Sequence, residues 1–158
     1  MRGRLRAAAV LLALLLVGCG TRPAATADWG ADFRTADGAA FAPGPGESPF
    51  VVVFWSPWAP PALALLRDIG TLADRAQVVT VMLEARDPRI ERLAAGDLLV
   101  VEPADDSVVD RYDIGLLPTV LVLDRQGRVA GRYEGFSPGL VEEIGRALAP
   151  AETEAIAD

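Results

Sequence analysis

The sequence contains no histidine, no lysine and no asparagine, and only one cysteine. All 15 basic residues are therefore arginines, and together with 22 acidic residues they give a net charge of −7. Without histidine there is no imidazole to act as a general base or metal ligand, which excludes Ser-His-Asp and Cys-His catalysis. A single cysteine excludes an intrachain disulfide and a zinc-thiolate cluster. The acidic balance argues against nucleic acid as a partner.

The single cysteine follows an N-terminal leader. Three arginines within the first six residues precede an apolar stretch over residues 7–17, which is too short to span a membrane. The stretch ends in Leu16-Val17-Gly18-Cys19, which resembles the bacterial lipobox, where the leader is cut before the cysteine and the thiol is acylated. We expect residues 1–18 to be a lipoprotein signal peptide and Cys19 to be lipidated. An ordinary signal peptide with an incidental cysteine is the alternative.

Cleavage at this point removes three arginines and no acidic residue, so the net charge moves from −7 to −10. Residues 19–30 then form the lipidated cysteine and a tether, because they are small, polar and proline-containing. We expect one globular domain over residues 31–149 and an acidic tail over residues 150–158. The predicted location is the bacterial cell envelope, outside the cytoplasm, with the lipid as membrane anchor.

The hydrophobic pattern between these ends predicts a mixed α/β domain. Phe50–Trp55 is a continuous apolar run typical of a strand buried on both faces, and the prolines that follow it favour the start of a helix. Ser137 and Pro138 fit the N-cap and first position of a final helix. The other expected elements are a hairpin over 33–41, helices at 62–76, 90–95 and 107–112, and strands at 78–83, 98–101, 119–123 and 128–133.

Two segments carry a family resemblance. Phe54-Trp55-Ser56-Pro57-Trp58-Ala59-Pro60-Pro61-Ala62 resembles the thioredoxin-like active-site segment Phe-Trp-Ala-x-Trp-Cys-Pro-Pro-Cys. Tyr112-Asp113-Ile114-Gly115-Leu116-Leu117-Pro118-Thr119 is similar to the second signature of that family, whose proline is cis and faces the redox pair. With the leader and the hairpin, about residues 31–149 resemble the membrane-anchored TlpA/ResA branch. The resemblance implies a thioredoxin fold, a mixed central β-sheet flanked by helices on both faces, with an N-terminal β-hairpin.

The resemblance also shows what this chain lacks. In the family, a dithiol at a helix start supplies the thiolate that attacks a disulfide, but here alanines stand at both positions, Ala59 and Ala62. An acid that commonly sits three positions further on is replaced by Leu65. The prediction is therefore a redox-inactive protein without catalytic residues. Two origins stay open: natural loss of both cysteines, or a double Cys-to-Ala change in an active thiol-disulfide oxidoreductase.

A binding groove is the feature that survives the loss of sulfur. The resemblance implies that the two motifs meet at one end of the sheet, where an extended polypeptide is held against the backbone before the cis proline. Core packing is the alternative role for the tryptophans, and for Trp55 it is the favoured one. The predicted groove residues are Trp55, Trp58, Pro60, Pro61, Leu117 and Pro118.

Other polar clusters carry weaker predictions. Four carboxylates at Asp105, Asp106, Asp110 and Asp113 have the chemistry of a calcium site, but the spacing is not that of a calcium loop, and a solvated turn is favoured. The charges between residues 86 and 92 favour an exposed, self-paired helix surface. Glu84 is interpreted as a strand-end residue. No metal and no cofactor are predicted.

These observations predict a lipid-anchored thioredoxin-like protein that binds an extended polypeptide or an envelope protein, or serves as a structural subunit, at the outer face of a membrane. The competing class is a thiol-disulfide oxidoreductase of the TlpA/ResA type.

Overall fold

The computed structural model describes residues 29–43, 46, 48–84 and 87–148. The elements in chain order are α1 (Trp29–Asp32), β1 (Phe33–Arg34), β2 (Ala40–Phe41), β3 (Phe50–Trp55), α2 (Pro60–Ile69), the 3-10 helix η1 (Gly70–Leu72), β4 (Gln77–Met82), α3 (Pro88–Ala94), β5 (Leu99–Pro103), α4 (Val108–Arg111), β6 (Thr119–Leu123), β7 (Val129–Glu134) and α5 (Leu140–Ala147).

The strands form one seven-stranded sheet in the order β2-β1-β5-β4-β3-β6-β7. The central strands β3, β4 and β5 are parallel, whereas β6 and β7 are antiparallel to their neighbours. At the other side of the sheet, β1 and β2 form the N-terminal hairpin, and β1 pairs with the end of β5. The sheet is therefore mixed, as the sequence pattern predicts.

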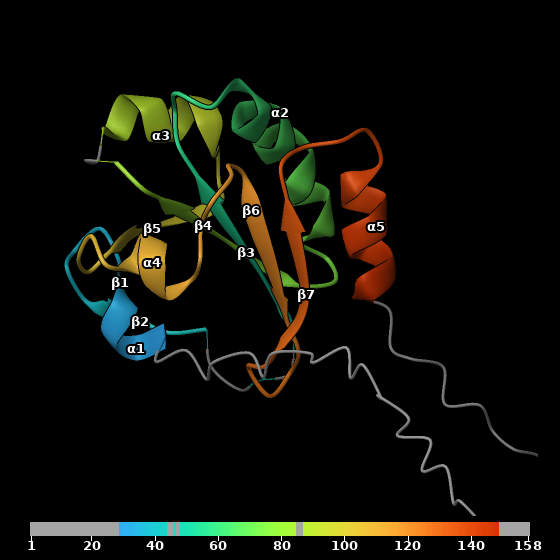
Figure 1. The fold of residues 1–158 in the computed structure, drawn as a ribbon, viewed down its shortest axis with the longest axis horizontal. Coiled ribbons are helices and arrows are strands. Elements are labelled where there is room, and N and C mark those ends of the chain that lie inside the picture. Colours follow the sequence, from blue (N-terminus) through green and yellow to red (C-terminus); the bar gives the residue numbers. More distant parts are fainter. Residues whose placement is uncertain (1–28, 44–45, 47, 85–86, 149–158) are drawn as a thin grey trace, which may run out of the picture.

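Helices cover both faces of the sheet, because alternate residues of the central strands point to opposite sides (Figure 1). On one face Val51 and Val53 pack under α2 and α5 in the first apolar cluster. On the other face Val52 and Phe54 pack under α1 and α4 in the second. β3 is buried at every position, which explains why its sequence is a continuous apolar run rather than an alternating one. The predicted fold class is confirmed.

Two predicted helices have wrong boundaries. The helix expected over 62–76 begins at Pro60 and ends at Ile69, and the chain continues as η1. Pro60 and Pro61 occupy the first turn, where a missing N–H costs nothing. The final helix begins at Leu140 rather than Pro138, because Gly139 takes a left-handed conformation with φ +91° and serves as N-cap in place of Ser137.

The predicted leader, lipidation site and most of the tether, together with the whole of the acidic tail, lie outside the described residues. Within the described part of the chain, no helix has both the length and the apolar character needed to cross a membrane.

Candidate functional site

The two motif segments meet at one end of the sheet. Phe54 of β3 pairs with Thr119 of β6, so the residues that follow Phe54 lie beside the residues that precede Thr119. These neighbours are the segment that leads into α2 and the segment that contains Pro118. The strand register therefore brings the two motif segments side by side.

The first motif places two methyl groups where the resemblance implies two thiols. Ala59 is half-buried and serves as N-cap of α2, whereas Ala62 is fully buried. The N–H of Ala59 donates to the carbonyl of Ser56, and the N–H of Ala62 donates to the carbonyl of Ala59. Pro60 and Pro61 have no N–H, so residues 59–62 leave no backbone donor free for an anion. Leu65, at the position of the missing acid, is fully buried in the core.

A polar pair that the sequence analysis missed lies beside this turn. The hydroxyl of Ser56 donates to Oε1 of Glu84 at 2.6 Å and accepts the N–H of Trp58 at 3.1 Å. Among the described residues nothing bonds to the buried Oε2 of Glu84. Ser56 and Glu84 are 28 positions apart, and only the parallel pairing of β3 with β4 brings them together. No local sequence signal could have found this pair.

The second motif forms a loop with a cis peptide bond between Leu117 and Pro118, as predicted. The carbonyl of Pro118 accepts the N–H of Gly135 at 2.7 Å, and the carbonyl of Leu116 accepts the hydroxyl of Thr119 at 2.6 Å. Within the described chain, no group bonds to the backbone N–H or carbonyl of Leu117. This residue therefore offers one donor and one acceptor to an added strand.

Exposed apolar side chains lie on the segments that form this end of the sheet. Trp58 is 79% exposed, Leu116 54% and Phe136 38%, and they are three of the five large exposed hydrophobic residues of the described chain. Leu116 and Phe136 were not predicted, because single apolar residues in loops carry no pattern. Trp55 is instead fully buried in the first cluster, so the core role favoured for it is confirmed.

Two of the other predicted carboxylates have structural partners. Asp105 accepts the N–H and the hydroxyl of Ser107 at the start of α4. Asp87 caps α3 by accepting the N–H of Arg89 at 2.8 Å. Glu91, expected on an exposed helix surface, is 7% exposed, because its position on α3 turns toward the sheet. No group of three or more potential metal ligands occurs among the residues that the structure describes.

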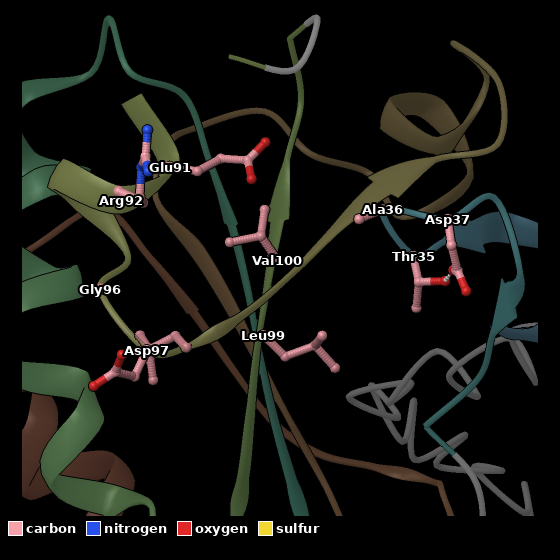
Figure 2. Close-up of a pocket in the computed structure, with 10 residues that line it drawn as sticks. Thr35, Ala36, Asp37, Glu91, Arg92, Gly96, Asp97, Leu99 and Val100 are labelled. Atoms are coloured by element: carbon pink, nitrogen blue, oxygen red, sulfur yellow. Dashed lines mark hydrogen bonds between the residues drawn. The ribbon is translucent and has the colours of Figure 1, made fainter. Parts of the chain in front are cut away.

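A hollow of about 460 Å³ lies away from both motifs. Its floor is β5, and it is bounded by the turn between β1 and β2 on one side and by α3 on the other (Figure 2). Its lining contains none of the predicted groove residues. The hollow therefore adds nothing to the site formed by the motifs.

Comparison with solved structures identifies the fold. The structure resembles the exposed lipoprotein thioredoxin of Streptococcus pneumoniae, with TM-score 0.60 and 20% identity over 74% of this chain and 96% of that one. It resembles StoA of Bacillus subtilis with TM-score 0.60 and 19% identity over 79% and 98% of the two chains. A secreted disulfide oxidoreductase of Mycobacterium tuberculosis gives TM-score 0.60 and 19% identity over 78% and 98%. These similarities show that the chain has a thioredoxin-like fold.

No protein-family model matches the sequence, and no curated protein matches it.

Proposed function

We propose that this protein binds an extended polypeptide at the end of its sheet and performs no thiol-disulfide chemistry. The observation that carries the proposal is the unpaired backbone of Leu117 beside a cis proline, next to exposed apolar side chains. A polypeptide that pairs with this backbone can place alternate side chains against Trp58 and Leu116.

The absence of redox chemistry rests on the residues at the start of α2. Disulfide exchange needs a thiolate that attacks one sulfur and a second thiol that resolves the mixed disulfide. Ala59 and Ala62 supply neither, and the single cysteine of the sequence, Cys19, belongs to the predicted leader junction. The groove therefore holds its ligand without reacting with it.

The proposed setting is the outer face of a bacterial membrane, with Cys19 lipidated and residues 19–30 as a tether. The leader and the lipobox-like segment support it. Two of the similar structures point the same way, since one is described as an exposed lipoprotein and another as secreted. The ligand in this setting is an extended segment of an envelope or secreted polypeptide.

A binding experiment tests the groove. The probe is a short fluorescent peptide with apolar side chains at alternate positions, and the measurement is its polarisation in the presence of the protein. Because apolar anchors at an interface contribute more than about 1 kcal/mol each, Trp58→Gln and Leu116→Gln should each weaken binding at least about fivefold.

Leu99→Gln is the matched control, because Leu99 is also an exposed apolar residue, at 43%, but belongs to β5 and lines the hollow between α3 and the β1–β2 turn. This variant should bind like the wild type. No binding by the wild type, or equal losses in all three variants, would contradict the proposed groove.

A further inference from the structure

The loop that presents Leu117 is held by hydrogen bonds at both ends. At its far end these are the bonds of Thr119 to Leu116 and of Gly135 to Pro118. At its start they come from the end of α4. The N–H of Asp113 donates to the carbonyl of Asp110 at 3.2 Å, and the N–H of Ile114 donates to the carbonyl of Val109 at 2.8 Å. Between Ile114 and the cis bond, no backbone N–H of the described loop donates a hydrogen bond. At its start, the position of the groove backbone therefore depends on how firmly the end of α4 is held.

Tyr112, at the end of α4, is held from two sides. Its ring lies 4.9 Å from the ring of Trp29, centroid to centroid, and 5.5 Å from those of Phe33 and Phe54. Its carbonyl accepts a guanidinium N–H of Arg132 at 2.8 Å, from β7. The next carbonyl, that of Asp113, accepts a second N–H of Arg132 at 2.5 Å. The loop that contains Leu117 therefore starts directly after a residue, Tyr112, whose ring and carbonyl are both held by contacts.

Further polar contacts to the end of α4 come from the N-terminal segment. Oδ2 of Asp32 accepts the hydroxyl of Tyr112 at 2.7 Å in a buried hydrogen bond. Oδ1 of the same residue accepts the guanidinium of Arg111, which also donates to Ser107. Asp32 is only 2% exposed. Because a buried carboxylate is costly unless it is paired, these two partners hold α4 against the end of α1.

We propose that Asp32 is a positioning residue of the groove: through Tyr112 and Arg111 it fixes the start of the loop whose Leu117 backbone pairs with the extended ligand. The inference rests on the proposed function. It gives the N-terminal segment, which continues from the predicted tether, a direct part in ligand affinity. Asp32 itself lies 79 and 80 positions before its partners, so sequence analysis had no signal for it.

The test compares the wild type with Asp32→Asn and Tyr112→Phe in the peptide-binding experiment. The matched control is Asp124→Asn, because Asp124 is also an aspartate paired with an arginine, Arg128, but in the turn at the other end of β6. Two further measurements are the amide NMR shift of Leu117 in the absence of peptide and the free energy of unfolding.

We expect at least a fivefold rise in the peptide Kd for Asp32→Asn and a smaller rise for Tyr112→Phe. Both variants should move the Leu117 amide signal under conditions in which they are fully folded. The control Asp124→Asn should change neither the Kd nor the Leu117 signal. If Asp32→Asn lowers stability but leaves the Leu117 signal and the Kd unchanged, Asp32 is only a structural residue and the inference fails.

The amide signal keeps this inference separate from the proposed function. If the wild type binds no peptide, the proposed function fails, and the Leu117 signal alone then decides whether Asp32 positions the loop. Should Asp32→Asn fail to fold, Tyr112→Phe removes only one hydroxyl and answers the same question. A Leu117 signal unmoved in folded Tyr112→Phe would overturn the inference in that case.

Discussion

Ser56 and Glu84 join the ends of β3 and β4 through a 2.6 Å hydrogen bond, directly before the first turn of α2. The same hydroxyl accepts the N–H of Trp58, so one side chain both ties the two strands together and shapes the turn that presents the exposed tryptophan. This turn sets where Ala59 lies relative to the cis-proline loop.

Ser56→Ala is therefore expected to destabilise the protein by about 1–3 kcal/mol, because it leaves both oxygens of Glu84 without a partner. Denaturant unfolding at neutral pH measures the change. Ser137→Ala is the control, since Ser137 is an exposed serine whose side chain has no hydrogen bond in the described structure. An unchanged unfolding midpoint for Ser56→Ala would show that the bond contributes nothing.

Gly135 brings β7 close to the cis-proline loop. It has φ +74°, and a Cβ at this position would lie 3.3 Å from a methyl carbon of Leu116. Gly135→Ala should cost about 1–3 kcal/mol, because a residue with a Cβ is strained in the left-handed region.

Gly115→Ala is the matched control for Gly135→Ala. Gly115 lies in the loop itself, its φ is not in the left-handed region, and a Cβ there would meet nothing within 4 Å. Thermal unfolding should show a clear loss for Gly135→Ala and a change within about 0.5 kcal/mol for Gly115→Ala. Equal effects of the two substitutions would refute the argument that the left-handed backbone and the close contact with Leu116 require glycine at position 135.

The turn between β6 and β7 has a defined pH dependence. The backbone N–H of Arg128 is the main cause that lowers the pKa of Asp124 below its ordinary value of 3.8, and the Arg128 side chain adds to it. Because the pKa is lower in the folded state, Asp124 contributes stability above the unfolded pKa and loses it as the pH falls through the folded one.

Asp124→Asn should therefore reduce the free energy of unfolding at neutral pH, and the difference from the wild type should shrink at about pH 2. Denaturant titrations at the two pH values measure it. A difference that stays constant or grows toward acid pH would contradict the assigned cause of the shift.

The buried strands were predictable from sequence, because continuous apolar runs such as Phe50–Trp55 and Thr119–Leu123 have few alternatives to a central strand. The meeting of the two motifs was expected from the family resemblance alone. Helix ends were harder to predict. Ser137 followed by a proline fits the cap pattern, but the left-handed Gly139 two residues later starts the helix instead. A local sequence pattern cannot decide which of two N-cap candidates, two positions apart, starts the helix.

Features that depend on long-range contacts were missed. The Ser56–Glu84 pair and the contacts of Asp32 connect residues far apart in sequence, so they exist only once the sheet has formed. The burial of Glu91 was missed for a related reason: its charge indicates an exposed face, and only the packing of α3 turns it inward.

The proposed anchor predicts a modified cysteine. Mass spectrometry of the membrane fraction should find an N-terminal peptide that begins at Cys19 and carries acyl chains, with more than one chain because a single chain binds membranes only marginally. Cys19→Ser should release the protein from the membrane fraction or leave the leader uncut. An unmodified Cys19 in a protein that retains Met1 would contradict the anchor.

The central claim is that the scaffold and groove are intact and only the sulfur is missing. The direct test measures reduction of a protein disulfide by the wild type and by the double variant Ala59→Cys/Ala62→Cys. In the variant, the thiolate at position 59 attacks the substrate disulfide and the thiol at position 62 resolves the mixed disulfide, so the substrate is reduced and the variant is oxidised. A reductant such as dithiothreitol then regenerates the dithiol.

We predict no activity above background for the wild type. The double variant should form an internal disulfide and gain weak activity, because Leu65 leaves the family's acid absent. Reduction of the disulfide by the wild type, or a double variant whose thiols never oxidise to a disulfide, would contradict the account.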